Sequence, residues 1–182
     1  MPPDLPRAIG FMVNTFVRPG DVKKMRHKHI EEVRGRHVYL RMNLPETKRH
    51  DKPVVSMRAA VRIYRRLCGR QSVTGWGRPE DFLFLPQVAN REHALAVLNF
   101  HFQWVLAECG LTVGPLGQKR TLYSLRHTAI TFRLLYGQGI DMLTPARNAR
   151  TSVNMIERFY ASTLSGEMNV GMLQSRRGGG AS

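Results

Sequence analysis

Two stretches of the sequence, YSLRHT (residues 123–128) and NARTSVNMIERFY (residues 148–160), decide how the fold and chemistry of this chain are interpreted. The first places Arg126 at the start of an expected helix, and the second places Tyr160 at the end of a polar one. An arginine fork binds two phosphate oxygens and keeps its charge. A phenolate forms far more readily than an alkoxide. The pair therefore suggests phosphate chemistry that needs no metal.

The charge of the chain indicates which phosphate is involved. Its 182 residues include 28 Lys and Arg against 13 Asp and Glu, a formal net charge of +15. Such a surplus attracts polyanions, and nucleic acid is the first candidate, with a ribosomal-type protein or a membrane-surface binder as alternatives. Residues 1–70 hold 17 of the basic and 6 of the acidic residues. We therefore expect the first third to supply much of the surface that binds the phosphate backbone.

Cysteine usage and hydropathy favour a reducing, cytoplasmic setting. Cys68 and Cys109 each lie in an apolar helical stretch, which favours buried free thiols over a disulfide. No apolar run approaches the ~20 residues that span a membrane, and the N-terminus has no signal-peptide pattern. His27 and His29 have strand spacing, but no Cys or carboxylate completes a compact set with them, so no metal site is expected.

Hydrophobic spacing predicts an α+β fold, a mainly helical single domain with a small three-stranded antiparallel sheet. The domain is expected to span residues 1–174, before a disordered tail at 175–182. A tight turn at 34–36 and a polar loop at 45–51 join the expected strands, at 27–33, 36–42 and 52–57. Helices are expected at 5–17, from Pro19, at 57–68 with Gly69 as its stop, and at 91–109, 123–136, 143–148 and 152–163.

Four stretches, in order, resemble the catalytic domain of the tyrosine recombinases, the phage-integrase family. RPGD (18–21) is similar to the first arginine box, with Asp21 for the usual Glu, and LRHT (125–128) to the second. TSVNMIERFY (151–160) is similar to the nucleophile box. Lys48 falls in the turn between the last two expected strands, where the family keeps its lysine. The likeness runs from about residue 5 to 163.

The resemblance implies a site-specific recombinase or integrase that cleaves and rejoins DNA strands through a 3′-phosphotyrosine intermediate. Tyr160 would attack the scissile phosphate, Arg18 and Arg126 would clamp its oxygens, Lys48 would protonate the leaving 5′-oxygen, and Asp21 would support Arg18. No metal, ATP or other cofactor is implied. The implied partners are double-stranded DNA and further copies of the chain, assembled as a tetramer on the DNA.

Two positions depart from the family pattern. Tyr123 stands three residues before Arg126, and Thr151 nine residues before Tyr160, where the family usually has His, and His or Trp, respectively. Tyr123 shares a helix face with Arg126 at i, i+3 spacing, and its hydroxyl can donate to phosphate, but it is a poor base near pH 7. Thr151 can donate one hydrogen bond.

Several alternatives remain open at this point. Arg49 and Lys52 are alternatives to Lys48 as the acid. The chain could be a non-catalytic DNA-binding remnant of an integrase, or have an activity like that of a type IB topoisomerase. Because the sequence begins within what resembles the first catalytic-domain helix, we expect the N-terminal DNA-clamping domain of the family to be absent.

Overall fold

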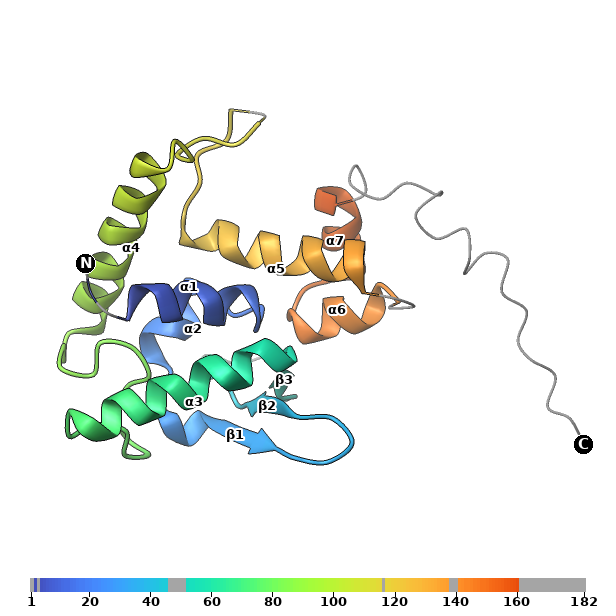
Figure 1. The fold of residues 1–182 in the computed structure, drawn as a ribbon. Helices are drawn as coiled ribbons and strands as arrows, with labels where there is room; N and C mark the ends of the chain where they lie inside the picture. The colour runs from blue at the N-terminus through green and yellow to red at the C-terminus, as the bar shows by residue number, and fades with distance from the viewer. Residues whose placement is uncertain (1, 3, 46–51, 116, 138–140, 161–182) are drawn as a thin grey trace, which may run out of the picture. The chain divides into compact units, whose positions relative to one another are not determined.

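A computed structural model describes residues 2, 4–45, 52–115, 117–137 and 141–160. It confirms the expected fold class, a mostly helical α+β chain with one small antiparallel sheet (Figure 1). Contacts divide the chain into two compact units, residues 1–129 and 130–182, and each is described by itself. The elements are α1 (Leu5–Val13), α2 (Pro19–Lys24), a 3-10 helix (His27–His29), β1 (Ile30–Val33), β2 (Tyr39–Met42), β3 (Val54–Val55), α3 (Arg58–Val73), α4 (Arg91–Glu108), α5 (Leu122–Tyr136), α6 (Leu143–Asn148) and α7 (Val153–Tyr160).

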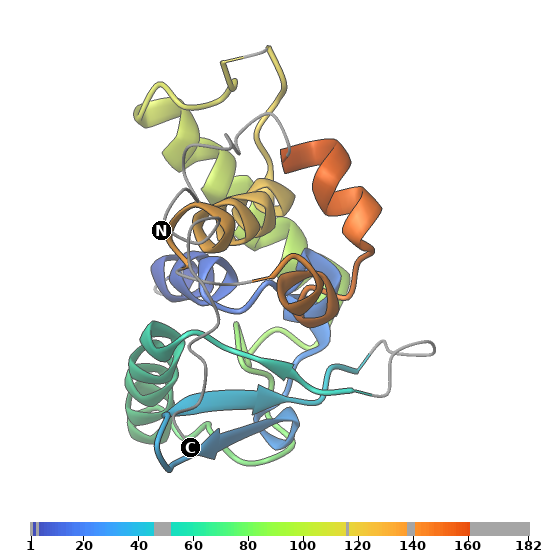
Figure 2. The ribbon, with the colours of Figure 1, turned by 90° about the vertical axis from the view of Figure 1, so that its right-hand side faces the viewer.

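The sheet of the first unit has the order β1-β2-β3, with both pairs antiparallel (Figure 2). Val33 pairs with Tyr39, so the connection is the five-residue segment 34–38 rather than the expected tight turn. Residues 27–29 were expected to be part of the first strand and instead form the 3-10 helix. The reason is a different backbone partner, because the N–H groups of His27 and Lys28 donate to Asp81 and Pro79 and not to a neighbouring strand.

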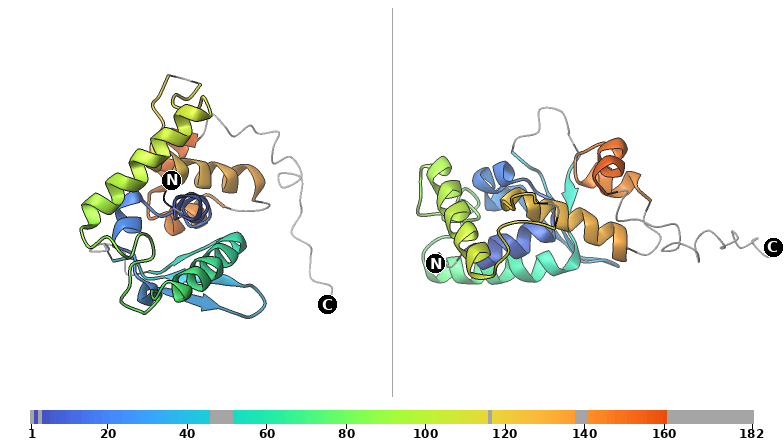
Figure 3. Two further views of the ribbon diagram at one scale, coloured as in Figure 1. Left: turned by 60° about the vertical axis from the view of Figure 1, so that its left-hand side comes forward. Right: turned by 90° about the horizontal axis from the view of Figure 1, so that it is seen from above.

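Helix α3 packs against α1 and β2 in the first unit, and runs beside the sheet in every view (Figure 3). It does not stop at Gly69 as expected but continues to Val73. Gln71, in the last turn, is buried, and its side chain donates to the carbonyl of Leu83 at 3.0 Å and contacts His27 Nε2 at 2.5 Å. These tertiary hydrogen bonds outweigh the cost of about 1 kcal/mol for a glycine inside a helix.

Helix α4 begins where predicted and is fixed at that end by Arg91. The Asn90 side chain caps the helix, accepting from the N–H of His93 at 3.0 Å. The guanidinium of Arg91 lies 4.0 Å from the centre of the Phe82 ring. It also donates to backbone carbonyls of residues 23, 84, 85 and 88. At the other end of α4, Cys109 is exposed, so the expectation that both thiols are buried is wrong; Cys68 is half-buried.

The second unit contains the C-terminal part of α5 with α6 and α7. Its buried apolar side chains among the described residues are Ile130, Pro145, Ala146, Ala149 and Ile156. Phe132 and Tyr136, on α5, are exposed and pack edge to face, with ring centres 5.8 Å apart. Among the described residues of both units, no helix combines the length and the apolar character needed to cross a membrane.

Candidate functional site

Arg126 is buried in the first unit although it carries a charge. It lies in the second turn of α5 and is 3% exposed. Its guanidinium donates to the backbone carbonyl of Phe16. Phe16 has a φ of 60°, a left-handed conformation that is rare for a bulky residue. This strained turn directs a carbonyl at Arg126, and such strain persists where the surrounding structure fixes it, often at functional sites.

Arg18 stands two residues after Phe16, at the N-cap of α2. Its backbone N–H donates to Asp21 Oδ2 at 2.8 Å, and Asp21 is 2% exposed. A carboxylate in the first turn accepts from N–H groups that the helix leaves unpaired and offsets the positive end of its dipole. The prediction of a helix start at Pro19 with Asp21 in its first turn is therefore confirmed, and this turn fixes the backbone that carries Arg18.

Tyr123 lies one helical turn before Arg126 on α5 and is 42% exposed. Its ring packs edge to face on His127, with ring centres 5.2 Å apart. It also lines a cavity of about 340 Å³ together with Pro19, the residue after Arg18, and with Glu92, Leu95, Ala96, Asn99, Thr121 and Leu122. In the first unit, Arg18 therefore lies at the start of α2, and Tyr123 and Arg126 lie in the first two turns of α5. The shared cavity brings the start of α2 next to the start of α5.

His127 follows Arg126 on α5, and its surroundings favour the uncharged form of its ring. Burial and, next to it, the positive charge of Arg126 lower the pKa of His127 below its ordinary value of 6.5. A neutral imidazole at this position adds no further positive charge beside the buried guanidinium.

Thr151 follows α6 in the second unit, at a tight helix end. The N–H of Thr151 donates to the carbonyl of Ala146 at 2.9 Å, and that of Arg150 to Arg147 at 3.0 Å. These two bonds form a Schellman motif, in which the residue at the position of Arg150 takes a left-handed conformation. Arg150 has a φ of 51° and is 6% exposed. Glycine is the ordinary residue at such a position, because it has no Cβ to strain.

Helix α7 starts directly after this turn. The Ser152 hydroxyl accepts from the N–H of Met155 at 3.2 Å and so caps the helix. The described part of α7 reaches Tyr160, inside the helix expected at 152–163, and the side chain of Tyr160 lies outside the described residues. The helix is about 11 Å long from Val153 to Tyr160. Because it follows directly from the turn at Arg150, that turn sets the position of the Tyr160 backbone.

Some of the expected residues lie outside the described part of the chain. Lys48 and Arg49 belong to the segment between β2 and β3 that is not described. The tail predicted at 175–182 is also outside it. Within the described residues, no group of three or more His, Cys, Asp or Glu side chains is arranged to hold a metal ion.

In each unit, one residue next to the expected catalytic residues was not singled out from the sequence. Phe16 gave no signal, because nothing local marks a phenylalanine for left-handed backbone. Arg150 gave a weak one, since it follows a short helix and precedes a Thr-Ser pair, where a C-terminal glycine is common.

Two solved structures of the Tn1549 transposon integrase, amino acids 82–397, share this fold. A tyrosine-to-phenylalanine variant in complex with transposon right-end DNA matches with a TM-score of 0.56 and 15% sequence identity, over 92% of this chain and 57% of the integrase chain. A complex with circular-intermediate DNA matches with a TM-score of 0.50 and 13% identity, over 92% and 58%. The chain therefore spans a little over half the length of these integrase chains.

At these identities the likeness concerns the fold. No model of a known protein family matches the chain, and no curated protein matches it.

Proposed function

We propose that this chain is the catalytic domain of a tyrosine recombinase, residues 1–174, which cleaves and rejoins duplex DNA through a 3′-phosphotyrosine intermediate. One observation carries the proposal. Arg126 is a buried arginine bound to the carbonyl of Phe16, two residues before Arg18. This hydrogen bond joins the Arg126 side chain to the segment that carries Arg18, and two arginine forks suit a pair of non-bridging phosphate oxygens.

Charge and fold add independent support. A net charge of +15 favours a polyanionic ligand, and duplex DNA carries one negative charge per ~1.7 Å of its axis. The solved structures that share the fold are integrases in complex with DNA. We therefore take double-stranded DNA as the partner, and assembly of four copies on two duplexes as the state in which strands are exchanged.

The proposed reaction is a reversible transesterification. The Tyr160 oxygen attacks the scissile phosphorus, forming a tyrosine–phosphorus bond as the bond from phosphorus to the 5′-oxygen breaks. The phenolic proton passes to water, and Lys48 gives a proton to the departing 5′-oxygen. A free 5′-hydroxyl of another strand then attacks the phosphotyrosine, so the number of ester bonds is conserved and no ATP is consumed.

The remaining residues act on the same phosphate or on its arginines. Arg18 and Arg126 balance the charge that accumulates on the phosphate oxygens in the transition state. Tyr123, half-exposed one turn from Arg126, and Thr151, at the start of the nucleophile segment, each offer one hydroxyl donor. Asp21 acts through the backbone of Arg18 and is a positioning residue.

Covalent capture tests the proposal without a known target sequence. Nicked duplexes with random sequence around the nick are incubated with the protein, and DNA that stays attached after denaturation is recovered and sequenced. A nick beside the cleavage point releases a short fragment, so the 5′-hydroxyl diffuses away and the adduct accumulates. We expect adducts joined at a shared sequence, and none with Tyr160→Phe.

Tyr136→Phe is a matched control, because Tyr136 is 74% exposed and lies on α5, outside the sequence stretch 148–160 that contains Tyr160. It should leave capture at the wild-type level. Binding of DNA with no adduct at any sequence contradicts the enzyme and leaves a non-catalytic DNA-binding remnant. Adducts without sequence preference, together with relaxation of supercoiled DNA, contradict a site-specific recombinase and indicate type IB topoisomerase-like activity.

A further inference from the structure

Helix α3 has an unusual charge content. Its 16 residues include five arginines and no Asp or Glu, so nothing on the helix itself neutralises them. Two of the five are paired elsewhere. Arg65 donates to Glu32 at 2.5 and 2.9 Å, and Arg70 donates to Asp4 at 2.7 Å.

The other three, Arg58, Arg62 and Arg66, form one exposed stripe at i, i+4 and i+8. None of them makes an ion pair with any residue that the structure describes. Like charges at i, i+4 destabilise a helix. The stripe is therefore unfavourable for folding, which suggests that an anion binds there.

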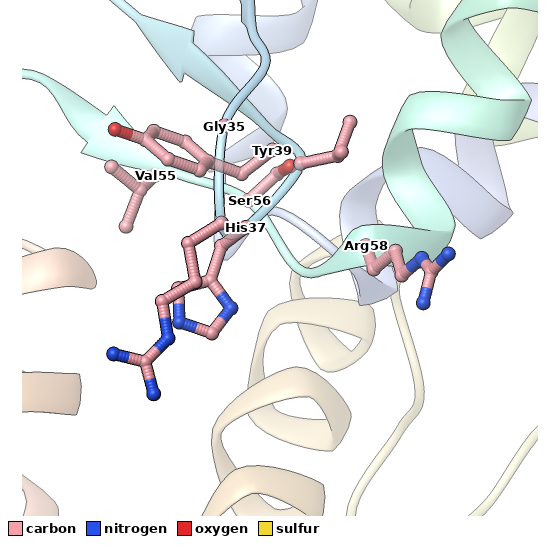
Figure 4. Close-up of a pocket in the computed structure, with 8 residues that line it drawn as sticks. Gly35, His37, Tyr39, Val55, Ser56 and Arg58 are labelled. Carbon is pink, nitrogen blue, oxygen red and sulfur yellow. The ribbon is translucent and has the colours of Figure 1, made fainter.

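Hollows lie beside the start of this stripe. Arg58 lines a cavity of about 720 Å³ with Arg36, His37, Tyr39 and Ser56 (Figure 4). Arg58 and Arg62 line a second cavity of about 530 Å³, and Val38 belongs to both. Arg36 also makes no ion pair with a described residue. We call Arg36, Arg58, Arg62 and Arg66 the arginine face.

The arginine face is distinct from the candidate site but adjoins it. Arg36 lies in the β1–β2 connection, at the end of the sheet where Val33 pairs with Tyr39. Helix α3 begins close to the segment that leads to Arg18, because the N–H of Met57 donates to the carbonyl of Asn14 at 3.0 Å. An extended ligand held at Arg18 could therefore continue over the arginine face.

We propose that the arginine face binds the phosphate backbone of the DNA that flanks the cleaved phosphate. Four residues of helix rise by about 6 Å, so successive arginines of the stripe can each bind a different phosphate of one strand. A repeated cation suits a repeated anion better than it suits a single carboxylate or lipid headgroup. Such contacts add affinity without reading sequence. The proposal takes DNA as the ligand from the proposed function but does not require Tyr160 to react.

The salt dependence of DNA binding tests this face. Affinity for a labelled duplex of arbitrary sequence is measured by anisotropy between about 50 and 200 mM salt, where each neutralised phosphate contributes about 0.9 to the slope of log K against log salt. We expect Arg62→Gln to lower the slope by about one contact, and the triple change Arg58→Gln, Arg62→Gln, Arg66→Gln to lower it by two to three contacts.

Arg65→Gln is the matched control. It removes the same charge from the same helix, but from an arginine already paired with Glu32. It should lower the slope by much less than Arg62→Gln. Circular dichroism of each variant verifies that α3 remains folded. If a Gln variant has lost helix, the Lys variant at the same position is measured instead. Because lysine keeps the positive charge, it should restore the wild-type slope of log K against log salt.

Two results would overturn the proposal. The first is an equal effect of Arg62→Gln and Arg65→Gln, which means that only net charge matters. The second is a larger loss of poly-glutamate binding than of DNA binding in the triple variant, which means that the face binds an acidic protein. The covalent capture assay reports on Tyr160 separately, so a failure of catalysis and a failure of this face give different results.

Discussion

The two units of this chain fix their candidate catalytic residues in opposite ways. In the first, Arg126 is buried against the carbonyl of Phe16, and the turn that carries Arg18 is held by the buried Asp21. In the second, Tyr160 belongs to α7, and among the described side chains of that helix Ile156 alone is buried. The candidate cations therefore lie against the core of the first unit, whereas the candidate nucleophile belongs to a helix that has one buried side chain among those described and that follows the turn at Arg150.

This difference has a physical consequence for the proposed chemistry. Charges fixed by a core need no reorganisation when the phosphate becomes more negative, which is the condition for electrostatic catalysis. A helix with few buried contacts opens locally at a lower free energy than the core does. Changes at the arginines should therefore act on the reaction rate, and changes before α7 should act mainly on the stability of the nucleophile segment.

The largest effect is expected from Arg126. Arg126→Ala removes a buried cation from the proposed phosphate site, and loss of one such group typically lowers a rate by about 10²–10³-fold. The measurement is the rate of covalent capture at saturating protein. Arg126→Lys should recover only part of the rate, because an ammonium group cannot reproduce the planar fork.

Folding must be separated from catalysis in this comparison. Arg126→Ala also leaves the carbonyl of Phe16 without its donor, so urea unfolding of each variant is measured alongside capture. A rate equal to the wild type in a folded Arg126→Ala protein would contradict the role of the buried arginine.

The second effect concerns the turn before α7. Arg150→Gly and Arg150→Ala both remove the side chain, but only glycine adopts a φ of 51° without strain. We expect the glycine variant to be more stable than the alanine variant by about 1 kcal/mol. Urea unfolding measures the difference, and it is independent of the contacts that the arginine itself makes. Equal stability would mean that residue 150 is not held in the left-handed region.

The comparison also shows how far the sequence could predict this site. The helix start at Pro19 and Asp21 was predicted, because its signals are local: a proline in the first turn and a carboxylate three residues after the N-cap. The bounds of α6 and, to within one residue, the start of α5 were also predicted. The left-handed backbone of Phe16 could not be, because it is imposed by a hydrogen bond to Arg126, 110 residues further along the chain.

The errors in the fold have the same origin. Gly69 is a local stop signal, but the tertiary hydrogen bonds of Gln71 extend α3 beyond it. The alternation at residues 27–33 predicts one strand, but residues 27–29 bind the loop at 79–81. Local signals predicted which elements exist, and contacts between distant segments decided where several of them end.

Gly69 provides a third prediction, which concerns the stability of the first unit. An added Cβ at Gly69 would meet nothing within 4 Å, and the position lies inside α3. Gly69→Ala should therefore stabilise the first unit by about 0.5–1 kcal/mol. Hydrogen exchange measures each unit separately, and we expect slower exchange in α3 and α1 with little change in α7. Equal slowing in α7 would mean that both units unfold as one.

The smallest effect is expected from His127, whose ring lies beside the buried guanidinium. Its pKa is lowered by burial and then by Arg126, so the unfolded chain takes up a proton at this histidine at a higher pH than the folded chain does. Folding stability should then decrease as the pH falls below about 6.5, through the range where only the unfolded histidine is charged. His127→Gln should reduce this decrease. The decrease is measured as the difference between the urea midpoints at about pH 7.5 and about pH 5.

His93, exposed on α4, offers the matched control. A His93→Gln protein should retain the wild-type difference, and a loss of the same size in both variants would mean that the surroundings of Arg126 do not set the charge of His127.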